Sequence, residues 1–200
     1  MNTDFKLPGN FFKKNKLPQI CAAELTYFKM TDLFEADKKG FSDYTLQTLA
    51  SLKPSMIDDD KAEKEMIEKA STPEQLVDLL RKVKGMSSTG SLYRKIIEKQ
   101  DETVPLVIEK YIRSSYDAFI ESSAIVLGNC DPKYAKELWD RYDHIRTPYA
   151  KSTACLVIGK AFEKDSGMFL YDQFLTFKSD HPSDTFEEAP LLMLYDIYYK

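Results

Sequence analysis

Apolar residues recur at intervals of three and four through most of this chain, which is the spacing that places them on one face of an α-helix. The clearest stripe consists of Val104, Val107, Ile108, Tyr111 and Ile112. No segment has the sustained alternation of apolar and polar residues that a half-buried β-strand requires. The pattern therefore predicts an all-α protein built from short helices.

Capping residues and prolines mark where these helices begin. Thr72 precedes Pro73, and Gln75 follows three residues after Thr72, which is the arrangement of a capping box. Asp131-Pro132 and Thr147-Pro148 have the same combination of a capping side chain and a proline. Further helices are expected from about Pro18 to near Gly40 and from Ser42 to just before Pro54, and from starts at Asp58, Leu92, Thr103, Ser166 and Thr185, with a polar turn over 86–91. Glu188 completes a capping box with Thr185.

Residues 1–18 lack the helical spacing. Phe5, Phe11 and Phe12 alternate there with lysines, and Pro8-Gly9 interrupts the chain. Two hypotheses fit this irregular N-terminal arm. It either docks its phenylalanines on the first helices as a cap or binds a partner, and residues 19–200 then form the helical domain.

Two stretches of the second half resemble each other. Residues 122–128 align with residues 153–159 at an offset of 31 residues, and a polar, capped helix precedes each stretch. The two units cover 103–128 and 131–161, and a weaker third covers 166–200. The second helix of each unit is apolar almost all round, so neighbouring units stacked in a row are needed to cover it.

These units resemble HEAT-like (armadillo-type) helical repeats. The resemblance implies an α-solenoid, in which antiparallel helix pairs form a right-handed stack. It also implies a non-enzymatic scaffold or adaptor that holds a protein or peptide on its concave face. The alternative architecture is an irregular helical bundle, and the sequence leaves the oligomeric state open.

The net charge and the absence of known motifs limit the functions that are expected of this chain. The chain has 28 basic and 32 acidic side chains and a net charge of -4, which disfavours nucleic acid as a partner. No phosphate-binding, zinc-protease or serine-hydrolase motif occurs, so no catalytic residue and no cofactor is predicted. Cys21, Cys130 and Cys155 are far apart, and no metal site is expected. The absence of a long apolar run favours a cytoplasmic protein without membrane spans.

The candidate partner-binding residues are Tyr134, Trp139 and Tyr142, with Asp140 and Arg141 beside them. Tyrosine and tryptophan are frequent at recognition surfaces, but they also fill the seams between repeats. The HEAT-like resemblance implies a second possibility, because DNA glycosylases of that architecture use an aromatic, an acidic and a basic residue. A third possibility is an acidic immunity-type inhibitor, which would neutralise a partner protein.

Overall fold

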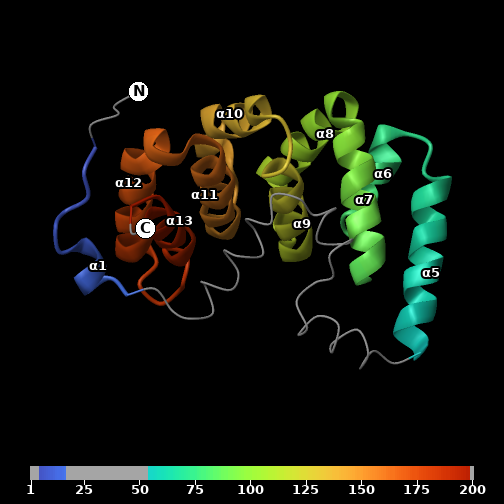
Figure 1. Ribbon diagram of the computed structural model, residues 1–200, viewed down its shortest axis with the longest axis horizontal. Coiled ribbons are helices and arrows are strands. Elements are labelled where there is room, and N and C mark those ends of the chain that lie inside the picture. Colours follow the sequence, from blue (N-terminus) through green and yellow to red (C-terminus); the bar gives the residue numbers. More distant parts are fainter. Residues whose placement is uncertain (1–4, 17–53, 199–200) are drawn as a thin grey trace. The chain divides into compact units, whose positions relative to one another are not determined.

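The structure is a computed structural model that describes residues 5–16 and 54–198 (Figure 1). These residues form helices and connecting loops without β-strands, so the all-α prediction is confirmed for this part of the chain. Cys21 and the helices expected from about Pro18 to near Gly40 and from Ser42 to just before Pro54 lie outside the described residues. In chain order the α-helices are α1 (Phe11–Lys14), α5 (Pro54–Lys69), α6 (Pro73–Leu79), α7 (Met86–Glu98), α8 (Gln100–Arg113), α9 (Asp117–Leu127), α10 (Pro132–Asp140), α11 (Pro148–Phe162), α12 (Gly167–Asp180) and α13 (Glu188–Tyr198).

Three helix starts with a local capping signal, those of α6, α10 and α11, lie where the sequence predicts them. At the start of α6, Thr72 Oγ1 accepts a hydrogen bond from the Gln75 N–H at 3.3 Å, and Gln75 Oε1 accepts one from the Thr72 N–H. Asp131 and Thr147 likewise accept backbone hydrogen bonds at the starts of α10 and α11. Each of these side chains satisfies one of the N–H groups that a helix leaves unpaired in its first turn.

Other helix starts differ from the prediction. α5 begins at Pro54, so Asp58 lies inside the helix instead of opening it. α8 begins at Gln100, and Pro105 lies within it, where the helix gives up one backbone hydrogen bond. α13 begins at Glu188, three residues later than Thr185. Residues 86–91 are the start of α7 and not a turn.

The chain divides into two compact units, and each is described by itself. The described part of the first unit comprises residues 5–16 and 110–198, and that of the second comprises residues 54–109. α8 belongs to both, because the division falls between residues 109 and 110.

Alternate helices of the first unit lie side by side and run parallel. α11 packs between α9 and α13 (Figure 1). Near their starts, Tyr149 Oη of α11 donates to Glu121 Oε1 of α9 at 2.6 Å. Near their ends, Lys160 Nζ donates to Asn129 Oδ1 at 3.0 Å. The N-terminal half of α11 therefore contacts the N-terminal half of α9, and the C-terminal ends of the two helices also lie together. The two helices thus point in the same direction.

α11 and α13 are parallel by the same criterion. Ser152 Oγ, near the start of α11, donates to the carbonyl of Phe186 just before α13 at 2.6 Å. Gly159, near the end of α11, lies against Met193 of α13. α10 packs on α11, and α12 packs on α13, while α9, α11 and α13 lie in a row.

The second unit contains a parallel pair whose members cap each other. The Glu63 carboxylate of α5 accepts hydrogen bonds from the N–H groups of Lys84 and Gly85 at 3.0 and 2.8 Å, at the start of α7. Lys95 Nζ of α7 donates to the carbonyls of Ile67 and Ala70 at 2.5 and 3.3 Å, at the end of α5. An anion at a helix N-terminus and a cation at a C-terminus both suit the helix dipole.

The N-terminal arm lies on the last two helices, whereas the sequence placed a docked arm on the first ones. The Phe11 ring is 5% exposed and packs against Tyr171 and Phe174 of α12 at centroid distances of 5.6 and 5.2 Å. The Phe12 ring lies 4.3 Å from that of Tyr195 in α13. The arm includes one helical turn, α1. The phenylalanines of the arm indicate that it can pack on helices, but the arm's sequence carries no information about which helices those are.

Candidate functional site

An aromatic cluster joins α10, α11 and α12. The Trp139 ring, near the end of α10, lies 5.0 Å from that of Phe162 and 5.3 Å from that of Phe169. All three rings are half-buried. Phe162 is the last residue of α11 and Phe169 lies in the first turn of α12, so the short 3₁₀ turn over Glu163–Ser166 holds the two phenylalanines near each other. We call Trp139, Phe162 and Phe169 the aromatic triad.

Two of the predicted tyrosines lie beneath the surface. Tyr134 and Tyr142 are each 5% exposed, so either ring offers a partner little area. The Tyr142 ring meets Phe169 edge to face at 4.9 Å and therefore supports the triad from inside. Its hydroxyl donates to Gln173 Oε1 at 2.9 Å and lies 3.7 Å from Cys155 Sγ. This hydrogen bonding satisfies the polar end of a buried ring.

The predicted charged residues lie beside Trp139 in separate ion pairs. Asp140 is exposed and pairs with Lys136 one helical turn earlier. Arg141 Nη1 lies 3.5 Å from Glu137 Oε1. The structure therefore gathers Trp139 and Tyr142 around Phe169, whereas Asp140 and Arg141 form a charged border on α10.

The thiols of Cys155, which is buried, and Cys130, which is half-buried, are poor nucleophiles. Burial raises the pKa of Cys155 to about 12. Burial, with a smaller effect of the Asp131 charge, raises the pKa of Cys130 to about 12 as well. The thiolate is the reactive form of cysteine, so both groups remain protonated near neutral pH. Burial also raises the pKa of the Tyr142 hydroxyl, with a smaller effect of Cys155.

Metal ligands do not come together in the described part of the chain. Across residues 5–16 and 54–198, no group of three or more His, Cys, Asp or Glu side chains could hold a metal ion. His144 is exposed at the end of a 3₁₀ turn, and His181 Nδ1 lies 3.8 Å from Asp184 Oδ2. No described helix is both long enough and apolar enough to cross a membrane.

Sequence reasoning selects Trp139 but misses the two phenylalanines that complete the triad. The available signal is their position, because Phe162 and Phe169 stand on either side of a short polar link between two predicted helices. Comparison of this chain with models of protein families, with curated proteins and with solved structures gave no match.

Proposed function

We propose that this chain is a non-enzymatic helical-repeat scaffold that binds a protein or peptide partner. The partner surface is the aromatic triad of Trp139, Phe162 and Phe169, with the charged border of α10 beside it. The observation that carries the proposal is this half-buried triad, because aromatic side chains are enriched at the centres of protein interfaces.

The arrangement of helices supports a repeat stack in each unit. In a stack of helix pairs, every second helix runs in the same direction and touches the equivalent helix of the next pair. α9, α11 and α13 have this relation, and so do α5 and α7. We propose on this basis that each unit is a short α-solenoid of the HEAT-like kind.

The surroundings of the triad favour a protein partner over a nucleic acid. A nucleic-acid surface needs clustered cations that neutralise phosphates. Lys136 of α10 pairs with Asp140, and Arg141 just after α10 lies beside Glu137, so a carboxylate accompanies each of these two cations. The chain as a whole carries a net charge of -4. An apolar centre with a mixed-charge border is the usual composition of a protein–protein interface.

A comparison of three full-length variants tests the proposal. Trp139→Ala and Phe169→Ala each remove a triad ring. Tyr116→Ala removes a ring of the same unit outside the triad, which is 45% exposed on the loop before α9. Partners captured by the unmodified chain from its native cell are identified by mass spectrometry, purified and titrated against each variant. We expect at least one partner whose affinity falls about 30-fold for both triad variants, as for a hot-spot residue, and is unchanged for Tyr116→Ala.

Two results would contradict the proposal. One is a set of partners that binds all three variants equally. The other is retention of DNA or RNA at low salt that weakens with Trp139→Ala, because this would favour the nucleic-acid alternative. Circular dichroism of each variant verifies that the helices are intact.

A further inference from the structure

In the first unit, the row of parallel helices α9, α11 and α13 ends at α13, which the N-terminal arm contacts. α11 has a helix of the row on each side, namely α9 and α13. α13 is apolar on nearly every side, because Leu191 and the three residues after it are all buried, and four consecutive helical residues span about 300°. Within the described residues, α11 and α12 are the helices that pack most extensively on it. Where a further helix pair would stack on α12 and α13, the N-terminal arm is found instead.

The arm is attached by ring contacts and by hydrogen bonds. The Phe5 ring lies 5.6 Å from Tyr171 and 6.3 Å from Tyr198, and so reaches both helices. The Tyr195 hydroxyl donates to the Asn15 carbonyl at 3.0 Å. Lys178 Nζ donates to Asn15 Oδ1 at 2.9 Å. These bonds join residues that are 163 and 180 positions apart in the chain.

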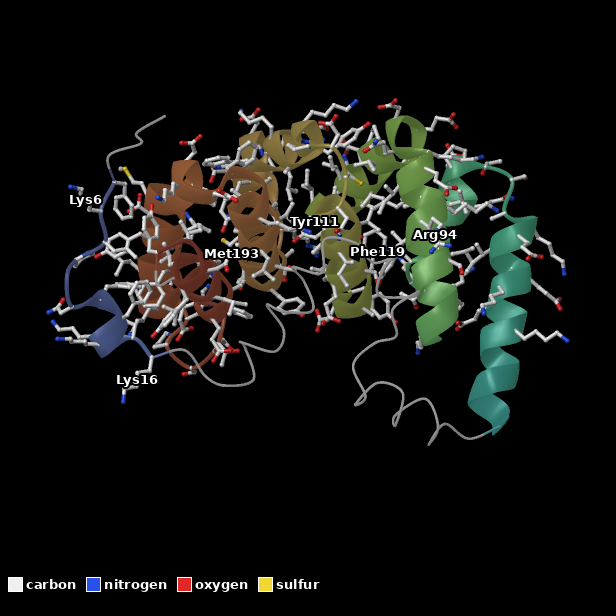
Figure 2. All side chains as sticks on the ribbon, viewed as in Figure 1. Lys6, Lys16, Arg94, Tyr111, Phe119 and Met193 are labelled. Atoms are coloured by element: carbon white, nitrogen blue, oxygen red, sulfur yellow. The ribbon has the colours of Figure 1, made fainter. Side chains whose placement is uncertain are left out.

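The outer side of the arm is basic. Lys6, Lys13, Lys14 and Lys16 are all exposed. In Figure 2 the side chains of Lys6 and Lys16 point away from α12 and α13. The arm thus has an apolar side toward the helices and a charged side toward solvent. A terminal element with a polar outer face is what keeps a helical-repeat protein soluble.

We infer that the arm is an end cap that prevents a second copy of this chain from docking on α12 and α13. The covered surface carries Tyr171 and Phe174 of α12 with Tyr195 and Tyr198 of α13. When the arm leaves, the same surface of a second copy can cover it, because twofold pairing of identical patches is the commonest way that chains self-associate. The inference requires no external partner, and it rests on the proposed helical stack but not on the aromatic triad.

The test compares two single substitutions in the full-length chain. Phe11→Asp places a carboxylate at the buried ring position and should release the arm. Asn10→Asp adds the same charge at the adjacent, exposed residue and should leave the arm docked. Hydrogen exchange of residues 5–16 reports release, and light scattering after gel filtration reports the mass at increasing protein concentration.

We expect Phe11→Asp to exchange rapidly in the arm and to form a discrete species of twice the mass of the unmodified chain. Asn10→Asp should behave like the unmodified chain. A synthetic peptide of residues 1–16 should return the Phe11→Asp protein to the lower mass. Adding Tyr195→Lys to Phe11→Asp should have the same effect, because it charges the uncovered surface.

The inference is overturned if the arm of Phe11→Asp is released while the mass stays unchanged at every concentration. It is also overturned if the variant forms a continuous series of aggregates that the peptide does not reverse, since no defined surface is then involved. If Phe11→Asp does not fold, Phe11→Ala is measured in the same way. An arm that remains protected in both Phe11 variants also contradicts the proposed anchoring.

Discussion

At the scale of single residues, Gly159 determines how closely α11 and α13 approach. A Cβ atom at this position would lie 2.8 Å from Met193 Cγ and 2.9 Å from Met193 Cβ. Alanine improves helix propensity by about 1 kcal/mol, but overpacking a buried contact costs about 1–3 kcal/mol. Met193 is fully buried and its Cβ cannot move without α13, so packing should dominate. We predict that Gly159→Ala lowers the free energy of unfolding by about 1 kcal/mol, measured by denaturant titration.

Gly9 provides the matched control for this substitution. A Cβ atom there meets nothing within 4 Å. Gly9→Ala should therefore change the free energy of unfolding by less than about 0.5 kcal/mol, as is usual for surface positions. Equal losses for the two alanine variants would mean that the contact with Met193 does not limit the approach of the helices.

At the scale of elements, Glu63 joins two helices by capping one from the other. Its carboxylate accepts the Lys84 and Gly85 N–H groups and the Ser88 hydroxyl at the start of α7. Glu63→Ala leaves these donors without that partner, and losing a helix cap costs about 0.5–2 kcal/mol. We expect a loss near the upper end, about 2 kcal/mol, because several donors are affected at once. Chemical denaturation followed by circular dichroism measures it.

Glu65 lies two residues away on the same helix and serves as the control. It forms a solvent-exposed ion pair with Lys69 at 3.6 Å. Such surface pairs contribute about 0–1 kcal/mol, so Glu65→Ala should be close to neutral. A loss as large as that of Glu63→Ala would show that general charge on α5, and not the cap of α7, is responsible.

The position of the capping residue in the chain explains which helix starts could be predicted from the sequence. α6, α10 and α11 carry their caps locally, in Thr72, Asp131 and Thr147, and their starts are predicted correctly. α7 begins after Gly85, which has no capping side chain, and the start depends on Glu63 22 residues earlier. When the capping residue is distant in the chain, the residues around the helix start contain no capping signal.

The candidate site likewise has a part that the sequence identifies and a part that only the packing of the helices determines. Trp139 and Tyr142 stand out by residue type, but their contacts with Phe169 depend on how α12 packs against α10 and α11. Sequence position does not specify that packing. Burial of Tyr134 and Tyr142 is likewise a property of the assembled helices.

At the scale of the whole molecule, the division into two units predicts which helices a destabilising substitution affects. In the helical stacks proposed for the two units, stability is approximately a sum over helix-pair repeats and the contacts between neighbouring repeats. Glu63 belongs to the second unit and Gly159 to the first, and α8 is the helix that runs from one into the other. Local unfolding of one unit therefore need not involve all of the other.

Native-state hydrogen exchange of the two variants tests this expectation. Glu63→Ala should accelerate exchange in α5 and α7 and leave α11 and α13 unchanged. Gly159→Ala should do the reverse. The amides of α8 should respond to both variants, because its first residues belong to one unit and its last residues to the other. If either substitution accelerates exchange equally in all these helices, the chain unfolds as a single cooperative structure, and the two units do not unfold separately.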